Sequence, residues 1–161
     1  MSALSKYLIN FKYVWNWRKP VLMLRMAKRA FEVLIQDKRP LRYVDLSIGN
    51  KCNMNCQHCF NKTSEKVNIK NEKRISPDYY AKIAEQAMNL GAVNFSFQGG
   101  EPLVYSDLRD YINAAKPYKN LISVTTNGLI LDIAKAKELK SWGVDIVTIS
   151  IDEFRTQEAI T

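Results

Sequence analysis

The segment YVDLSIGNKCNMNCQHCF, residues 43–60, joins a strand pattern to a loop that holds all three cysteines of the chain. Val44, Leu46 and Ile48 alternate with Tyr, Asp and Ser, and this period of two predicts a β-strand. A strand that runs directly into clustered metal-ligand side chains predicts a site at its carboxyl end. The remainder of the chain repeats this order of a strand followed by an unusual loop.

Three more strand patterns follow, separated from one another by helical patterns. Strands are expected at AVNFSF (92–97), LISVT (121–125) and VDIVTISI (144–151), with helices near residues 76–91, 106–116 and 132–142. Strands that alternate with helices of these lengths form βαβ units around a parallel sheet. A full eightfold barrel typically needs about 250 residues. The 161 residues of this chain therefore predict an α/β fold that is a partial (β/α) barrel of about four units.

Each predicted strand is followed by a loop whose residues are suited to a binding or catalytic site. QGGEP follows the second strand, TNG follows the third, and Ser150 to Asp152 close the fourth. The carboxyl ends of parallel strands meet at one edge of a sheet, so these loops and the cysteines are expected to converge.

The charge of the chain divides it into two parts. Ten Lys or Arg and only two acids, Glu32 and Asp37, lie in residues 1–42, so the whole net charge of +8 belongs to that segment. We therefore expect a basic helical extension over residues 1–42 and a core domain over residues 43–161. The net-neutral core gives no reason to expect a nucleic-acid partner.

The composition and the cysteines of the chain indicate in which cellular compartment the protein is expected. Hydrophobic residues make up 47% of the chain, and no stretch reaches 18 consecutive apolar residues. The amino terminus lacks the pattern of a secretory signal. Three cysteines within eight residues argue against a disulfide framework and for the reducing cytoplasm.

Two amphipathic helical patterns occupy the basic extension. In the second, Met23, Ala27, Phe31 and Leu34 share one face, and Arg25, Lys28, Arg29 and Glu32 share the other. Such helices either pack on the domain or dock on a partner or an anionic membrane surface through residues 1–36. Periodicity leaves both alternatives open.

The cysteines are too few for a closed structural metal site. Structural zinc takes four ligands, and His58 is the only histidine in the chain. An iron–sulfur cluster is normally held by four thiolates, so a cluster held by Cys52, Cys56 and Cys59 leaves one iron open. A zinc-binding module remains the alternative at this point.

The C-x3-C-x2-C spacing resembles the radical S-adenosylmethionine (SAM) superfamily, in its MoaA/SPASM-like branch. GGEP at residues 99–102, TTNG at 125–128 and SID at 150–152 match the family's motifs in the family's order. The resemblance covers roughly residues 43–152. It implies a [4Fe–4S] cluster that cleaves SAM reductively to a 5′-deoxyadenosyl radical, which abstracts hydrogen from a substrate. A peptide, a cofactor precursor and a lipid remain open as substrates, and flavodoxin or ferredoxin is the implied electron donor.

The resemblance also implies roles for single residues. The three cysteines, which are also the catalytic residues, would bind three irons. Contacts to SAM would come from the following residues: Gly99, Gly100 and Glu101 at its amino group, Thr126 and Ser150 at its carboxylate or ribose, His58 and Phe60 at its adenine, and also Asn127 and Asp152. Simpler explanations stay open, since the glycines and Asn127 suit turns, Thr126 and Ser150 are strand-end hydroxyls, and Asp152 can cap a helix.

The family's usual core has six units, whereas this chain has strand patterns for four. We expect the chain to be the N-terminal part of a radical SAM enzyme, with a split protein or a degenerate remnant acting with a partner as alternatives. In the last two cases it would be a non-catalytic iron–sulfur or zinc-binding module.

Overall fold

The computed structural model describes residues 18–56, 59 and 73–151. The elements, in chain order, are α2 (Pro20–Leu34), β1 (Tyr43–Ser47), α3 (Pro77–Leu90), β2 (Asn94–Gln98), the 3-10 helix η3 (Pro102–Val104), α4 (Leu108–Ala114), β3 (Leu121–Thr126), α5 (Ile133–Ser141) and β4 (Ile146–Ile149). None of the helices within these ranges has the length and apolar character that crossing a membrane requires. The first predicted amphipathic pattern, His58, Phe60 and Asp152 lie outside the described residues.

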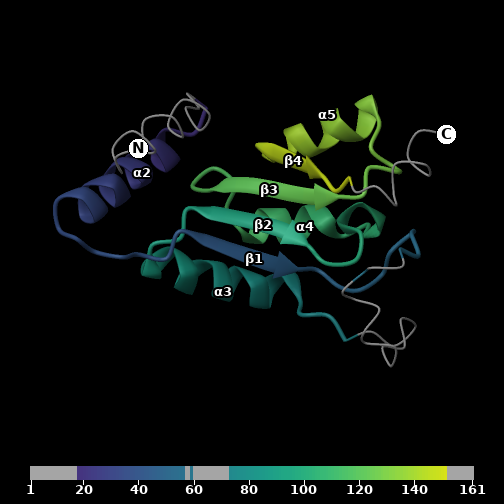
Figure 1. The fold of residues 1–161 in the computed structure, drawn as a ribbon, viewed down its shortest axis with the longest axis horizontal. Coiled ribbons are helices and arrows are strands. Elements are labelled where there is room, and N and C mark those ends of the chain that lie inside the picture. The colour runs from purple at the N-terminus through teal and green to yellow at the C-terminus, as the bar shows by residue number, and fades with distance from the viewer. Residues whose placement is uncertain (1–17, 57–58, 60–72, 152–161) are drawn as a thin grey trace.

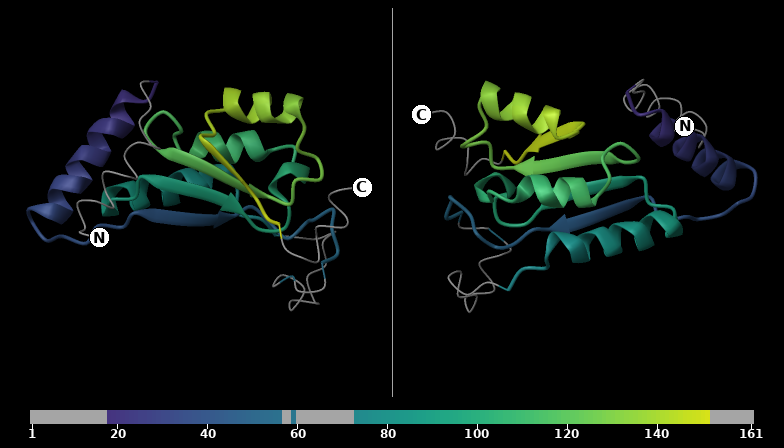
Figure 2. Two further views of the ribbon diagram at one scale, coloured as in Figure 1. Left: turned by 45° about the horizontal axis from the view of Figure 1, so that its top comes forward. Right: turned by 180° about the vertical axis from the view of Figure 1, so that it is seen from behind.

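The four strands form one parallel sheet in the order β1-β2-β3-β4 (Figure 1). Each strand lies beside the next one along the chain, and right-handed crossovers in such an order put the connecting helices on one face. The crossover helices α3 and α4 therefore lie on the same side of the sheet, as the view from behind shows (Figure 2). The predicted α/β fold is confirmed, with four parallel strands and the three crossover helices α3, α4 and α5 between them in the described residues.

The two faces of the sheet differ in chemistry. Alternate residues of each strand point to opposite faces. On β2, Phe95 and Phe97 are fully buried against the helices, where they join Ile122 and Val124 of β3 in the core. The opposite face instead carries small polar side chains on neighbouring strands, such as Ser96, which pairs in register with Ser123 and Asp45. The face away from the helices is therefore polar.

Helix α3 begins and ends where its sequence signals lie. The Ser76 hydroxyl accepts a hydrogen bond from the backbone N–H of Tyr79 at 3.3 Å, and Pro77 occupies the first turn. Gly91 ends the helix with φ of 116°, a left-handed conformation that favours glycine. This helix runs back along the sheet and so returns the chain to the start of β2.

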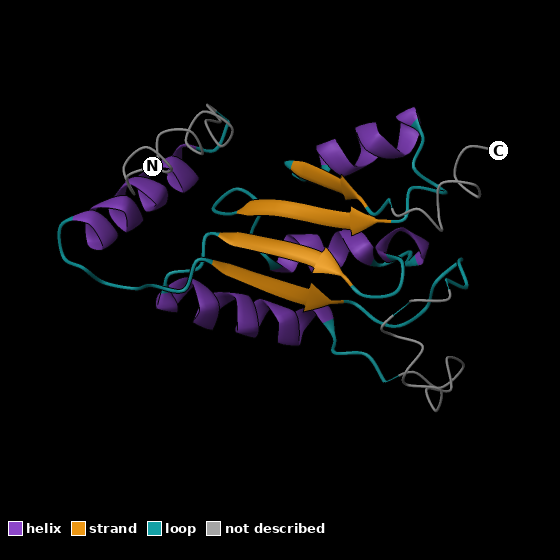
Figure 3. Cartoon of the chain, viewed as in Figure 1, coloured by secondary structure: helices purple, strands orange, loops and turns teal. Residues whose placement is uncertain are grey.

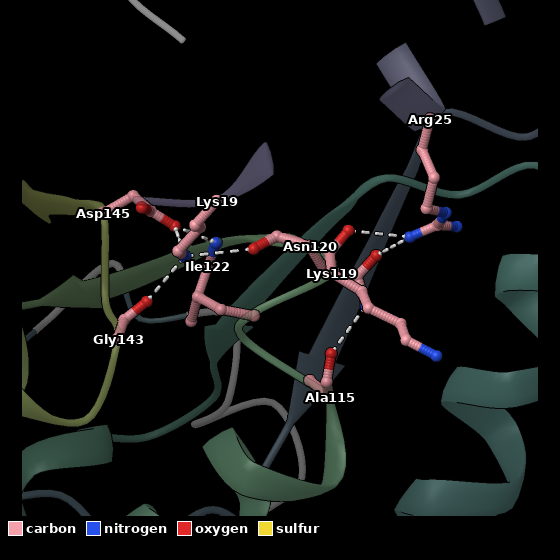
Figure 4. Close-up of polar contacts among 8 residues, drawn as sticks. All are labelled: Lys19, Arg25, Ala115, Lys119, Asn120, Ile122, Gly143 and Asp145. Carbon is pink, nitrogen blue, oxygen red and sulfur yellow. Dashed lines mark hydrogen bonds and ion pairs between the residues drawn. The ribbon is translucent and has the colours of Figure 1, made fainter. Parts of the chain in front are cut away.

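Helix α2 lies beyond the amino ends of the strands, at the opposite end of the sheet from the cysteine loop (Figure 1). The ammonium of Lys19 is buried and donates to the carbonyls of Asn120 at 3.1 Å and Gly143 at 3.0 Å, and it pairs with the carboxylate of Asp145. Arg25 donates to the carbonyl of Ala92 at 2.7 Å, and Figure 4 shows how it and Lys19 reach the loops beside the sheet. Two of the basic side chains therefore fasten the helix to the sheet.

The two predicted faces of α2 meet different surroundings. Glu32 is only 9% exposed and pairs with Arg29, and Arg25 contacts the sheet. The outward face carries Leu24, Phe31 and other apolar side chains, of which these two are 73% and 53% exposed. Part of the charged face therefore packs on the domain, while an apolar stripe faces outward.

Candidate functional site

The loops at the carboxyl ends of the strands lie on one side of the molecule (Figure 3) and enclose a pocket of about 160 Å³. It is lined by eight of the residues predicted for the site: Cys52, Cys56, Cys59, Gly99, Gly100, Thr126, Asn127 and Ser150. Met54, Gln98 and Thr125 also line it, and their only signal in the sequence is that they adjoin motif residues. The four predicted loops therefore converge.

A larger hollow of about 770 Å³ lies between α4, α5 and β4. Its wall includes Lys19 and Trp142 but none of the cysteines. We assign the site to the smaller pocket, because that pocket gathers thiols and polar groups that can bind a cofactor.

Two glycines bring the loop after β2 against the cysteine loop. A Cβ on Gly99 would lie 2.5 Å from the carbonyl oxygen of Gly49, and a Cβ on Gly100 would lie 2.2 Å from that of Lys51. The Gly100 N–H donates to the Gly49 carbonyl at 2.8 Å, and the Glu101 N–H donates to the Lys51 carbonyl at 2.9 Å. Both positions require glycine because backbone meets backbone there.

The carboxylate of Glu101 does not line the pocket. It is fully buried, and it accepts hydrogen bonds from Leu103 N–H at 3.0 Å, the Thr126 hydroxyl at 2.7 Å and Asn127 N–H at 2.7 Å. Both oxygens of Glu101 are bonded to protein donors here, and its predicted contact with the amino group of SAM stays a prediction. Glu101 fastens the loop after β2 to the loop after β3.

Thr126 takes part in the same arrangement. Besides donating to Glu101, its hydroxyl accepts the N–H of Gly128 at 3.1 Å, and the residue is only 1% exposed. The hydroxyl that we expected to contact SAM therefore holds the loop in shape. Ser150 lies beside it on the pocket wall, where its N–H extends the sheet by donating to the Thr126 carbonyl at 2.8 Å.

The side chain of Asn127 bridges its own loop and the cysteine loop. Its Oδ1 accepts the N–H of Leu129 at 3.0 Å, and its Nδ2 donates to Oδ1 of Asn53 at 2.7 Å. The same Nδ2 lies 3.8 Å from the sulfur of Cys52. Asn127 thus holds its turn and also reaches a cysteine.

The three cysteines are free thiols that reach the pocket from one loop. Cys52 is exposed, and Cys56 and Cys59 are half-buried. The sulfur of Cys52 accepts the N–H of Met54 at 3.4 Å. Among the described residues, no three His, Cys, Asp or Glu side chains form a group that could hold a single metal ion.

A parallel α/β sheet that collects three thiols and a glycine-lined wall at the carboxyl ends of its strands has the architecture of a protein that binds an iron–sulfur cofactor. The chain belongs to the radical SAM superfamily, whose family model matches residues 46–158.

Known relatives and solved structures agree with this family. The chain is 34% identical over 125 residues to a protein of Methanosarcina mazei named "Probable GTP 3′,8-cyclase", with 75% of this chain and 36% of the relative covered. It is 35% identical over 118 residues to a protein of the same name in Methanococcus aeolicus, with 71% and 38% covered. The chain thus spans little more than a third of the length of these curated relatives.

Two solved structures share the fold. The crystal structure of BtrN in complex with AdoMet and 2-DOIA matches with a TM-score of 0.57 at 22% identity, over 73% of this chain and 50% of that one. Streptococcus suis SuiB bound to S-adenosylmethionine matches with a TM-score of 0.52 at 20% identity, over 81% and 28%.

The cofactors of the superfamily are a [4Fe–4S] cluster and SAM, and the thiols that line the pocket are the ligands that such a cluster takes. Each thiolate of such a cluster binds a different iron, so the three thiols need to share a cavity and not to surround one ion. All three line the pocket here. Gly99 and Gly100 on the same wall let the loop after β2 pack directly against the loop that carries the cysteines.

Proposed function

We propose that this chain forms the cluster- and SAM-binding part of a radical SAM enzyme. The observation that carries the proposal is that loops from four successive strands place three thiols, two obligatory glycines and strand-end polar groups in one pocket. Cys52, Cys56 and Cys59 would hold three irons and leave the fourth open for SAM. When bound, the cluster supplies the electron that cleaves SAM to methionine and a 5′-deoxyadenosyl radical, which abstracts hydrogen from the substrate.

The residues of this chain would bind and orient the cofactors. Gly99 and Gly100 let the loop after β2 pack against the cysteine loop, which would put the backbone of this wall next to the cluster and within reach of the amino group of SAM. The hydroxyl of Ser150 and the amide of Asn127 line the same pocket and can form hydrogen bonds with SAM there. Glu101 and Thr126 would keep these loops in place from below.

The test is anaerobic reconstitution with iron and sulfide. We expect about four irons and four sulfides per chain, as a [4Fe–4S] cluster requires, and release of 5′-deoxyadenosine when SAM and a strong reductant are added. A matched variant with Cys56→Ala should lose the cluster. A cluster-loaded protein that releases no 5′-deoxyadenosine would refute the catalytic part. Zinc without labile sulfide would favour the alternative of a non-catalytic metal-binding module.

The substrate is proposed from the relatives alone. GTP is the first to test, because the two relatives compared above are both named as GTP cyclases. An electron donor such as flavodoxin or ferredoxin would reduce the cluster.

We also propose that α2 docks on an anionic membrane surface, which would make the protein a peripheral protein of the cytoplasm. The outward face of α2 exposes Leu24, Phe31 and Ile35 at 73%, 53% and 70%, and Lys28 lies among them. The acid of this helix, Glu32, turns inward. An apolar stripe with bases and no acids beside it suits the interface of an anionic bilayer.

Flotation with phosphatidylglycerol-containing vesicles tests the membrane proposal. Changing Leu24, Phe31 and Ile35 to Gln should abolish flotation, whereas Leu90→Gln and Ile133→Gln, at residues that are 67% and 76% exposed elsewhere, should not. These changes spare the residues that fasten α2 to the sheet, which deletion of the helix would not. Equal flotation of all variants, or dimerisation of the wild type through the stripe, would contradict membrane docking.

A further inference from the structure

The amide of Asn127 has a fixed orientation. Its Oδ1 accepts the N–H of Leu129 at 3.0 Å, which determines which end of the amide is the oxygen. The NH2 group must then face the cysteine loop. It carries two protons, so it can donate to Oδ1 of Asn53 at 2.7 Å and also toward the sulfur of Cys52 at 3.8 Å.

The position of Asn127 is set from inside the protein. The fully buried carboxylate of Glu101 accepts the Asn127 N–H at 2.7 Å and, through its other oxygen, the hydroxyl of Thr126 at 2.7 Å. The backbone of Glu101 is itself bonded to the cysteine loop, since its N–H donates to the Lys51 carbonyl at 2.9 Å. The buried Glu101 therefore holds both the backbone of Asn127 and the loop that carries Cys52.

The sulfur of Cys52 faces two N–H groups. The Met54 N–H donates to it at 3.4 Å from the backbone, and the Asn127 amide approaches from the neighbouring loop. Hydrogen bonds to the sulfurs of an iron–sulfur cluster are one of the factors that set its reduction potential. A donor stabilises the added negative charge of the reduced state, so it raises the potential.

We propose that Asn127 is a positioning residue for the cluster, which donates its side-chain N–H to the Cys52 sulfur and thereby raises the reduction potential, with Glu101 holding it in place. This inference rests on the proposed function, because it requires a cluster bound through Cys52. It gives Asn127 a role toward the cluster in addition to the predicted contact with SAM.

Redox titration of the anaerobically reconstituted full chain, followed by electron paramagnetic resonance without SAM, tests the proposal. Asn127→Ala should shift the midpoint potential below that of the wild type. Asn127→Asp should shift it further in the same direction, because a carboxylate oxygen would replace the donor beside the sulfur. Asn113→Ala, on α4 and outside the pocket wall, should leave the potential unchanged.

The outcomes separate this inference from the proposed function. A wild-type chain that binds no [4Fe–4S] cluster refutes the proposed function. If the wild type binds the cluster and the Asn127→Ala variant has an equal or higher reduction potential, the tuning role alone is refuted. This holds even if the variant binds less cluster than the wild type. Failure of both Asn127 variants to load also overturns it, because tuning requires the cluster to bind without the amide. Glu101→Gln, which places an NH2 group among donors, should displace Asn127 and lower the potential as well.

Discussion

Replacing Lys19 with Met should destabilise the whole domain. The ammonium of Lys19 bonds to two backbone carbonyls at 3.1 and 3.0 Å and to the carboxylate of Asp145, and the two charged side chains are 9% and 10% exposed. Removal of one partner of a buried ion pair costs about 3–5 kcal/mol. Asp145 keeps a donor in the N–H of Ile122 at 2.8 Å, so we expect the lower end of that range.

Urea unfolding of the metal-free protein, followed by circular dichroism, measures this loss. With a slope of about 2 kcal/mol per molar, a loss of about 3 kcal/mol lowers the midpoint by about 1.5 M. Lys28→Met is the matched control, because Lys28 is exposed on the same helix. Its effect should stay within about 0.5 kcal/mol.

A double variant identifies the interaction responsible. Adding Asp145→Asn to Lys19→Met removes the unpaired carboxylate, so the double variant should recover about 1 kcal/mol or more relative to the sum of the single changes. The reasoning is refuted if Lys19→Met behaves like Lys28→Met. That result would mean that α2 does not stabilise the sheet.

Three further predictions concern other parts of the molecule. Gly100→Ala would place a Cβ 2.2 Å from the carbonyl oxygen of Lys51, and we expect it to separate the two loops and abolish cluster loading in iron analysis; loading equal to wild type would contradict this. The hydrogen bonds from Arg74 lower the pKa of Asp107, so this pair stabilises the fold above the unfolded pKa of about 3.9 and loses its effect as the pH falls through the lower folded value. The stability difference between wild type and Asp107→Asn should accordingly be present at pH 7 and vanish in strong acid, and a difference independent of pH would refute the pairing. Burial raises the pKa of Tyr80 to about 12, so its contribution is fully present below about pH 10 and is lost as the pH rises through the folded value. An ultraviolet titration should show a transition near pH 12 that Tyr80→Phe removes while the other transitions stay unchanged, and a variant that keeps this transition would refute the assignment.

The strands and the convergence of their loops could be predicted from the sequence, because both depend on local patterns. Alternation marks Val44 and Leu46 as one face of β1, and the parallel order then brings the carboxyl ends together. The cysteines follow β1 directly, so their place in the pocket needed no further information. Capping signals likewise placed the ends of α3.

The role of Glu101 could not be predicted in the same way. A glutamate after two glycines and before a proline looks like an exposed loop residue, and nothing in the sequence states which way its side chain points. Its burial depends on donors from another strand, Thr126 and Asn127, which lie 25 and 26 positions away. The orientation of α2 could not be predicted for a related reason, because the acceptors of Arg25 belong to Ala92 and to Lys119 in the loop before β3.

The hydrogen bonds around Glu101 connect the loops of the pocket to one another without a bound cofactor. Gly99 and Gly100 allow the loop after β2 to bond to the cysteine loop, and Glu101 then bonds the same loop to the one after β3. The side chain of Asn127 then connects the loop after β3 to the cysteine loop, because it donates a hydrogen bond to Asn53, beside the first cysteine. A change in one loop must therefore shift the others, and the thiols do not have to be collected from separate mobile segments when a cluster forms. Burying the carboxylate of Glu101 is costly, because a charged group loses its contact with water. Its bonds to the neighbouring loop explain why it lies directly beside the two glycines that line the pocket.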